Sequence, residues 1–484
     1  MAIYDLVVLG SGPAGRRAAI QAAKLGKSVL VVDNRARVGG VSVHTGTIPS
    51  KTLRETVLNL SGWRERGFYG PAYRVKREIG AEDLSSRLGK TLEHEIAVLE
   101  HQFARNGVRT IVGEGKFLGA HQIAVCSRVG ERLIEEVVEA ARVLIAVGTE
   151  PYRPLEIPFN ATSVLDSDDF IQNPRVPRSL TVVGAGVIGL EYATIFSALD
   201  VPVTLIEPRS AILEFMDREI VEHLIYQMRD RGIALRLSSK VETVAFSPAG
   251  MPICVLDDGR TIHSEMVLFT AGRVGATRSL NLGACGLATD SRGRLSVDPA
   301  TYQTAVPHIY AAGDVIGFPS LASTSMEQGR TAACHAFDQP GPAADQSFPI
   351  GIYAVPELSS VGLTEEQVRA RGLAYECGIA RFRETSRGHI MGISGGILKL
   401  IVECGTRRVV GVHIIGEGAT ELIHIGQAVI NLRGTIDYFI DNSFNYPTLA
   451  EAYKVAALDA WNRLLHQPSN VVVLEDRKLQ PAVR

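Results

Sequence analysis

Three glycines near the N-terminus stand at a spacing that suits phosphate binding. Gly10, Gly12 and Gly15 follow a short apolar run and open a helical pattern, and Asp33 ends the next apolar run. Without side chains, the backbone can approach a pyrophosphate at the positive end of the helix, while the carboxylate accepts hydrogen bonds from a ribose. An isolated motif can be an ordinary turn, but this one lies inside a complete strand-turn-helix-strand unit. We predict a dinucleotide site here.

The same arrangement occurs a second time. Gly184, Gly186 and Gly189 precede Glu207, which lies as far after the third glycine as Asp33 does in the first motif. A carboxylate at this place favours NAD(H), because a 2′-phosphate would meet like charge. Arg209 follows shortly after, and arginine is a common partner for phosphate. One site with both features can accept NAD(H) and NADP(H), although Arg209 can equally be a solvated surface charge.

The elements around these motifs predict the fold class. Residues 3–33 and 179–207 contain continuous apolar runs, which are typical of parallel strands buried on both faces. From Phe348 onward the apolar runs are shorter and partly alternating, which favours an antiparallel sheet followed by helices. We expect an α/β protein with two doubly wound, Rossmann-like dinucleotide-binding domains and an α+β C-terminal domain.

Domain boundaries follow from the last strand of each dinucleotide-binding unit and from a proline-rich segment after residue 150. The run at 309–314 is expected to return to the first sheet, which makes the first domain discontinuous. We predict a first domain in two parts (1–150 and 276–347), a second domain (151–275), a C-terminal domain (348–466) and a tail (467–484).

Composition excludes several classes of function. The chain has 484 residues, 46% apolar and 21% charged, and a net charge of -2, so neither nucleic acid nor an anionic membrane surface is expected as partner. No apolar stretch reaches the length of a membrane span, which is roughly 18 residues or more. The six cysteines are scattered without metal-type spacing, so we expect no metal site and no disulfide framework. A reducing cytoplasm and small-molecule ligands fit best.

The order of motifs resembles a known family over nearly the whole chain. The segments are GSGPAG, GGVSVHTGTIPSK, GAGVIGLE, YAAGD, PELSSVGLTE and YPTLAEAY, and they are similar to the class I pyridine nucleotide-disulfide oxidoreductases. The resemblance implies FAD at the first site and NAD(P)(H) at the second, with Asp314 on the flavin ribitol. It also implies a homodimer formed through residues 348–466. The predicted cofactor-binding residues are completed by Gly40, Ser42, Thr47 and the strand-closing Gly148 and Gly272.

Two departures from the family pattern bear on the reaction. The family loop reads GGxCxxxxCxPxK, and Ser42 and Thr47 stand here at the two cysteine positions. Hydroxyls cannot form or break a disulfide, so dithiol chemistry is excluded at this loop. The family's His-Pro acid/base motif has become Tyr446-Pro447, with Glu451 after it, and a tyrosine with a pKa of about 10 is a poor base at neutral pH. We expect Tyr446 to be a packing residue.

The resemblance also places an ion pair beside the flavin. Lys51 and Glu191 match the lysine and glutamate that, in the family, pair near flavin N5 and the nicotinamide. A cation there stabilises negative charge that develops on the isoalloxazine ring. Without the resemblance, a solvated lysine at a helix start and a charge near a helix terminus are the better interpretations of Lys51 and Glu191.

The function expected from these features is hydride exchange between nicotinamides. Hydride transfer between nicotinamide C4 and flavin N5 needs stacking and little acid/base help, so the loss of both cysteines and of the histidine is coherent. Within the family, GTIPSKTLRE and FNYPTLAEAYKVAALD most resemble the soluble pyridine nucleotide transhydrogenases. Two alternatives stay open, namely a diaphorase or quinone reductase of the same fold, and a non-catalytic FAD-binding subunit. The sequence does not give the preferred nucleotide or the direction of the reaction.

Overall fold

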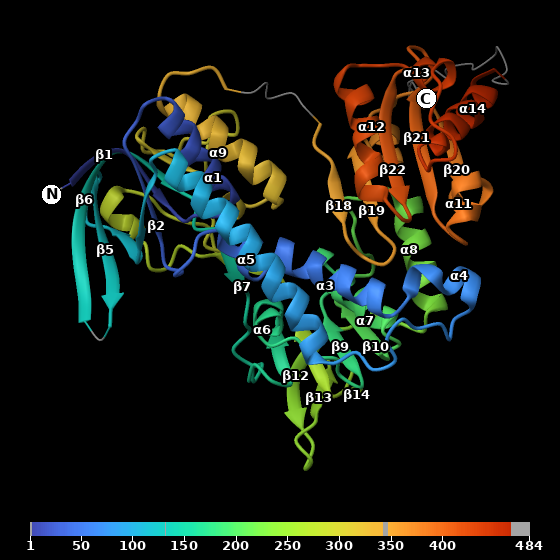
Figure 1. Cartoon of the computed structure of the whole chain (residues 1–484), viewed down its shortest axis with the longest axis horizontal. Helices are drawn as coiled ribbons and strands as arrows, with labels where there is room; N and C mark the ends of the chain where they lie inside the picture. The colour runs from blue at the N-terminus through green and yellow to red at the C-terminus, as the bar shows by residue number, and fades with distance from the viewer. Residues whose placement is uncertain (1, 131, 342–346, 466–484) are drawn as a thin grey trace, which may run out of the picture.

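The chain folds into three regions that lie side by side (Figure 1). The structure is a computed structural model that describes residues 2–130, 132–341 and 347–465. In Figure 1 the first region lies on the left, the second at the bottom and the C-terminal region at the upper right. The two modules with parallel sheets and the antiparallel C-terminal sheet confirm the predicted fold class. The domain boundaries given above stay a prediction.

The first module is built on a parallel sheet with an antiparallel extension. Its strands are β1 (Ala2–Leu9), β2 (Val29–Asp33), β3 (Arg109–Val112), β4 (Glu114–Phe117), β5 (Gln122–Val129), β6 (Arg132–Ile145) and β17 (Ile309–Ala311). Strands β3, β2, β1, β6 and β17 are parallel neighbours, whereas β4, β5 and the start of β6 form an antiparallel meander. The strand that completes the parallel part therefore comes from far along the chain.

Two helices cover one face of this sheet and touch each other closely. They are α1 (Pro13–Lys24) and α9 (Ala322–Ala336). A Cβ atom at Gly329 would lie 2.0 Å from the carbonyl oxygen of Ala14, so the two helix backbones are in direct contact. Small residues on α1, among them Ala18 and Ala22, are fully buried. Close packing at this point requires glycine on α9.

The second module has a five-stranded parallel sheet in the order β11-β10-β9-β15-β8. Its strands are β8 (Val164–Asp166), β9 (Leu180–Val183), β10 (Val203–Glu207), β11 (Ala234–Leu237) and β15 (Met266–Phe269), and its helices are α6 (Ser167–Gln172), α7 (Val187–Ala198) and α8 (Arg218–Asp230). A small antiparallel sheet adds β12 (Val241–Phe246), β13 (Pro252–Leu256) and β14 (Thr261–His263). The two chain crossings between the modules pair with each other as β7 (Thr149–Pro151) and β16 (Arg273–Gly275).

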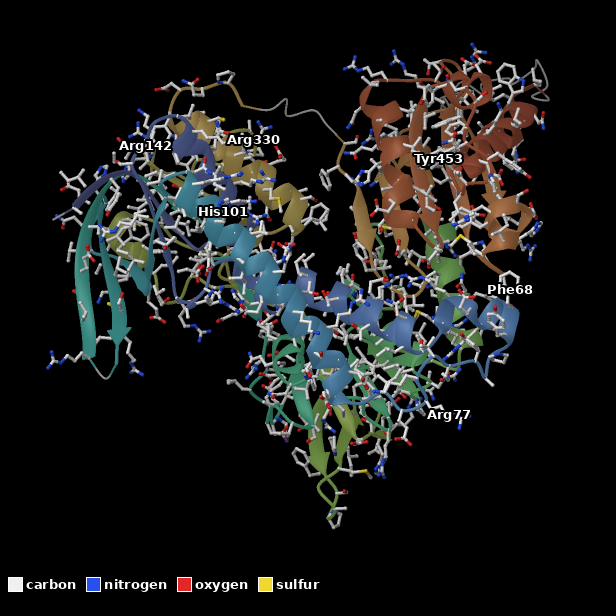
Figure 2. The ribbon with its side chains drawn as sticks, in the orientation of Figure 1. Phe68, Arg77, His101, Arg142, Arg330 and Tyr453 are labelled. Atoms are coloured by element: carbon white, nitrogen blue, oxygen red, sulfur yellow. The ribbon has the colours of Figure 1, made fainter. Side chains whose placement is uncertain are left out.

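The C-terminal region is a five-stranded antiparallel sheet in the order β18-β19-β22-β21-β20. Its strands are β18 (Ile350–Ile352), β19 (Leu358–Gly362), β20 (Tyr375–Arg381), β21 (Ile397–Glu403) and β22 (Val409–Ile415), and its helices are α10 (Glu365–Ala370), α11 (Ser386–Ile390), α12 (Ala419–Asn431), α13 (Asp437–Asp441) and α14 (Glu451–Leu465). Tyr453 of α14 lies inside this region, and its hydroxyl donates a hydrogen bond to the carbonyl of Leu422, 2.7 Å away (Figure 2).

Helices from the first part of the chain connect the three regions. They are α2 (Gly40–His44), α3 (Thr47–Leu60), α4 (Arg66–Tyr69) and α5 (Ala81–Arg105). At the far end of this segment Phe68 lies below the C-terminal region (Figure 2), close enough that a Cβ atom at Gly392 would meet its ring at 2.8 Å. None of the described helices combines the length and the apolar character that crossing a bilayer would need.

Candidate functional site

A cleft lies where the parallel strands of the first module end. Many of the residues predicted from the sequence line it, namely Gly10, Gly12, Asp33, Gly40, Ser42, Thr47, Gly148 and Asp314. These residues follow the carboxyl ends of β1, β2, β6 and β17, together with the loop that leads into α2 and α3. In open α/β sheets ligands bind at this edge, so the fold itself brings these distant segments to one place.

The three glycines of the first motif have different roles. Gly10 has φ = 103°, and a Cβ atom there would lie 2.4 Å from the carbonyl oxygen of Ala146. At Gly15 a Cβ atom would lie 1.9 Å from the carbonyl oxygen of Gly10, so both positions are fixed by chain packing. At Gly12 the nearest atom to a Cβ would be the Cα of Gly40, 4.0 Å away. Gly12 therefore leaves its space to the cleft, at the start of α1.

This glycine loop fits a pyrophosphate. Gly12 caps α1, Pro13 opens the helix, and the first turn holds no acidic side chain, so the positive end of the helix dipole is not neutralised. Asp33 accepts hydrogen bonds from the backbone amide and the hydroxyl of Ser11, at 2.7 and 2.6 Å. The carboxylate thereby fixes the loop from the end of the neighbouring strand.

Asp314 adds a carboxyl group to the same cleft. Burial raises the pKa of Asp314, and the positive charge of Arg273 acts in the opposite direction without cancelling that effect. A carboxylate that is poorly hydrated gains from hydroxyl donors. The residues present thus fit FAD, with the glycine loop for the pyrophosphate and Asp314 for a polyol chain.

The second module repeats the geometry of the first. Gly184 has φ = 103°, and a Cβ atom there would lie 2.7 Å from the carbonyl oxygen of Thr270. At Gly189 it would lie 1.9 Å from the carbonyl oxygen of Gly184, whereas nothing lies within 4 Å of a Cβ at Gly186. Gly186 caps α7, which also has no acidic residue in its first turn. A second dinucleotide fits here for the same physical reasons.

The acid of the second motif is covered by the arginine that follows it. Glu207 accepts hydrogen bonds from Nε and Nη2 of Arg209 at 2.8 and 3.2 Å, and from the amide of Ala185 at 2.7 Å. Burial acts to raise the pKa of Glu207, but the hydrogen bonds from Arg209 and Ala185 outweigh it and the pKa is lowered. Sequence spacing brought these two residues together as candidates, and the structure places them in an ion pair.

Lys51 and Glu191 meet between the two modules, as the resemblance implied. Nζ of Lys51 lies 2.8 Å from both carboxylate oxygens of Glu191, whose side chain is only 4% exposed, whereas that of Lys51 is 26% exposed. The amide of Tyr353, from the C-terminal region, donates to Glu191 at 3.0 Å. Nζ of Lys51 also lies 4.9 Å from the centre of the Tyr353 ring. The pair is therefore held by all three regions.

A second network holds the loop of residues 39–51 to the chain crossing between the modules. Arg273 lies 3.0 Å from Asp168 at the start of α6, and its Nε donates to the hydroxyl of Thr149 at 2.9 Å. The hydroxyl of Thr45 donates to the other oxygen of Asp168 at 3.0 Å. Sequence reasoning missed Asp168, Arg273 and Tyr353, because no local motif marks them and their partners lie far away along the chain.

The loop positions that carry sulfur in disulfide reductases border the cleft with hydroxyl-bearing residues. Ser42 and Thr47 line the cleft, and the Ser42 hydroxyl donates to the carbonyl of Gly39 at 3.0 Å. All six cysteines are free, and among the described residues that line the cleft none is a cysteine. Burial raises the pKa of Cys254 and Cys377 to about 12, which keeps these thiols protonated at neutral pH. No dithiol is available among the described residues of this site.

The remaining predicted residues lie apart from the cleft. Gly272 has φ = 115° and follows β15, where its carbonyl accepts a hydrogen bond from the amide of Tyr152. Tyr446 is 72% exposed, and its hydroxyl shares a hydrogen bond with that of Ser386. Glu451 accepts a hydrogen bond from the amide of Ser386. Within this chain Tyr446 does not pack into a core, so its packing role stays a prediction about an oligomer.

Two dinucleotide modules, a lysine-glutamate pair between them and an antiparallel C-terminal region together define a two-nucleotide flavoprotein oxidoreductase. Residues 4–329 match the family model described as pyridine nucleotide-disulphide oxidoreductase, and residues 348–457 match the dimerisation domain of that family. The chain belongs to the pyridine nucleotide-disulphide oxidoreductase family. Its cofactor is FAD, and its dimerisation domain supports a homo-oligomer.

Relatives with similar sequences share one name. A protein of Mycobacterium tuberculosis (strain ATCC 25177 / H37Ra) is 48% identical over 461 residues, covering 95% of this chain and 98% of the relative. A protein of Marinomonas sp. (strain MWYL1) is 41% identical over 470 residues, covering 95% of this chain and 99% of the relative. Both are named soluble pyridine nucleotide transhydrogenase.

Solved structures with a similar fold have more distant sequences. The HOCl-induced flavoprotein disulfide reductase RclA from Escherichia coli has a TM-score of 0.83 and 25% identity, covering 94% of this chain and 99% of the other. LpdA from Mycobacterium tuberculosis has a TM-score of 0.85 and 26% identity, covering 95% of this chain and 99% of the other.

Proposed function

We propose that this protein is an FAD-dependent NAD(P)+ transhydrogenase, which transfers hydride reversibly between NADPH and NAD+. It is an oxidoreductase, and NAD(H) and NADP(H) are its substrates. The observation that carries the proposal is the cleft of the first module, where Ser42 and Thr47 stand in place of a dithiol. A site with two nucleotide modules and no thiol can exchange hydride between nucleotides but cannot reduce a disulfide.

FAD, when bound, supplies a ring that takes a hydride from one nicotinamide and gives it to another. We assign its binding to Gly10, Gly12, Gly15, Asp33, Gly40, Gly148 and Asp314, beside the hydroxyls of Ser42 and Thr47. We assign nicotinamide nucleotide binding to Gly184, Gly186, Gly189, Glu207, Arg209 and Gly272. These assignments are supported by the shared cleft and by the repeated glycine geometry.

Lys51 is proposed to supply a fixed positive charge, and Glu191 to hold it in place. Glu191 is only 4% exposed, so if the ammonium group turned away, the carboxylate would be buried without a counter-charge and would keep only the amide of Tyr353 as a donor. A preorganised cation in a partly dehydrated site lowers the cost of negative charge that develops during hydride transfer. The three regions thus hold one charge at a set position.

A cytoplasmic location is proposed with this function. The reaction consumes and produces only nicotinamide nucleotides, and the free cysteines suit a reducing compartment. The relatives described above carry the word soluble in their names.

An anaerobic experiment tests the proposed function. The purified yellow protein is mixed with NADPH, loss of the flavin band is followed, and NAD+ is then added. Recovery of the band with formation of NADH is the expected result. If NAD+ fails to restore the colour and a quinone restores it, the protein is a quinone reductase instead. If neither NADPH nor NADH changes the band, the chain is a non-catalytic FAD-binding subunit.

A further inference from the structure

The carboxylate of Glu207 has no free position for a ribose. A carboxylate offers about four lone-pair positions. Oε1 accepts from the amide and Nε of Arg209, at 3.1 and 2.8 Å, and Oε2 accepts from the amide of Ala185 and Nη2 of Arg209, at 2.7 and 3.2 Å. Four donors therefore fill the group that is expected to meet the nucleotide. Any ribose hydroxyl that binds Glu207 must displace one of them.

Only the guanidinium group can be displaced without moving the backbone. The amide of Ala185 is part of the glycine loop. The amide of Arg209 is held in place by backbone hydrogen bonds on both sides. The amide of Ser239 donates to the carbonyl of Glu207 at 3.1 Å, and the amide of Ser238 donates to the carbonyl of Arg209 at 3.0 Å. The Arg209 side chain is 53% exposed, whereas that of Glu207 is 5% exposed. Because the Arg209 guanidinium reaches water, it can turn away when ribose hydroxyls take over its two donor positions on the buried carboxylate.

We propose that Arg209 is the residue that lets one site accept both nucleotides, by moving its guanidinium off Glu207 to meet a 2′-phosphate. This inference rests on the proposed function. With NAD(H), the ribose hydroxyls take the positions of Nε and Nη2 on Glu207, and the guanidinium turns to water. With NADP(H), the released guanidinium pairs with the 2′-phosphate and separates its charge from that of Glu207.

The first module shows that the fold does not require an ion pair between this arginine and the acid of the motif. Arg35 follows Asp33 at the same spacing at which Arg209 follows Glu207. Asp33 accepts from Ser11 and from the amide of Arg35 at 2.9 Å, and in the described part of the chain no ion pair joins the Arg35 guanidinium to it. The acid of the first module keeps acceptor capacity for a ribose. The arginine cover is confined to the module that must exchange two different nucleotides.

Removing Arg209 should therefore change the two affinities in opposite directions. For NADP(H) the variant loses a charge-assisted bond and leaves the phosphate facing Glu207. For NAD(H) it removes a competitor for the carboxylate. A residue with a purely structural role would change both affinities in the same direction.

The test uses the FAD-containing enzyme in anaerobic stopped-flow experiments, with NADPH alone and with NADH alone. The readout is the nucleotide concentration that gives half of the maximal rate of flavin bleaching. Arg209→Met should raise this value for NADPH about tenfold or more and lower it a few-fold for NADH, with little change in either maximal rate. Glu207→Gln should have the opposite pattern. Arg218→Met is the control, because that side chain is 79% exposed on α8 of the same module.

Other outcomes separate this inference from the proposed function. If Arg209→Met shifts both values in one direction, or leaves the NADPH value unchanged, the role given to Arg209 is wrong while wild-type transhydrogenation stands. If the wild-type flavin is bleached by NADPH but NAD+ yields no NADH, the proposed function fails whatever the variant does.

Discussion

The two dinucleotide modules share one backbone design but differ in what covers their ligand sites. In each, the first glycine has φ = 103° and the third would bring a Cβ atom to 1.9 Å from the carbonyl of the first. In each, the middle glycine borders open space. The first module adds α9, β17 and Asp314 from a late part of the chain, whereas the second leaves Glu207 under a half-exposed arginine.

This difference teaches how one fold can serve as a retained and as an exchanging site. A ligand enclosed by segments from several parts of the chain leaves only if those segments move together. A ligand that replaces one exposed side chain can come and go without such a movement. We therefore assign the retained cofactor to the first module and the exchanging substrates to the second, and four predictions test this division.

The largest effect is expected from filling the third glycine of either motif. Gly15→Ala places a Cβ atom against the backbone of its own glycine loop, so this variant should be made without bound FAD. Gly189→Ala should instead keep its yellow colour and lose bleaching by NADPH. Absorbance of the purified proteins and stopped-flow bleaching decide this. Gly186→Ala is the folding control, since nothing lies within 4 Å of its Cβ; FAD retained by Gly15→Ala would contradict the division.

The charge between the modules should have the next largest effect. Lys51→Met removes the ammonium from Glu191, and we expect bleaching by either nucleotide to slow about a hundredfold. Because the Glu191 carboxylate is left buried with only one donor described, the variant should also melt at a lower temperature. The double variant Lys51→Met/Glu191→Gln should recover the melting temperature but not the rate. Recovery of both would show that Lys51 acts on stability alone.

The two modules should respond to pH with opposite signs. The pKa of Asp314 is raised from 3.8, so between 3.8 and its folded value the native state binds more protons and stability falls as pH rises. Asp314→Asn should therefore stabilise the FAD-free protein at neutral pH. The pKa of Glu207 is lowered from 4.5, so its contribution is present above 4.5 and is lost as pH falls through the folded value.

Urea unfolding of both variants across pH measures these signs. The stability gained by Asp314→Asn should disappear toward pH 3.8, the ordinary pKa of its carboxyl group. Glu207→Gln should lower the free energy of unfolding at neutral pH but not in acid. If both variants changed stability in the same direction, the proposed difference between the modules would be wrong.

The smallest effect is expected at the two loop hydroxyls. Ser42→Ala loses one hydrogen bond to Gly39, worth about 1 kcal/mol, and Thr47→Val keeps the shape of its side chain. Neither should change the rate of nucleotide exchange more than about threefold, because no step depends on a group that titrates there. Steady-state rates with NADPH and NAD+ measure this. A large loss of this rate would show that the hydroxyls of the loop take part in the reaction.

The parts of the molecule that the sequence predicted well are those with local signals. Gly10, Gly12 and Gly15 with Asp33 are recognised from their spacing within one short stretch of chain, and the parallel sheet follows from continuous apolar runs. The return of residues 309–311 to the first sheet agrees with the pairing of β17 and β6. Lys51 and Glu191 came from resemblance alone, since 140 residues separate them.

Apart from the Lys51–Glu191 pair, contacts between regions were out of reach of sequence reasoning. Lys399 of β21 is 1% exposed and lies 3.1 Å from Asp217 at the start of α8, joining the C-terminal region to the second module. No periodicity marks a lysine inside an apolar strand as the partner of a distant aspartate. The same holds for Tyr353 and Asp168, whose roles depend on how the three regions are packed together.

The contact of Gly329 with Ala14 also determines when the first module can be completed during translation. The ribosome makes the glycine loop and α1 first, but α9 and the strand that completes the sheet follow only after the whole second module. At roughly 5 to 20 residues per second, the unfinished first module waits on the order of 10 to 40 seconds for its last pieces. All five strands of the second module's parallel sheet are made before β17 and α9, so this protein should acquire its yellow colour late in translation, after the sheet that carries its substrate site.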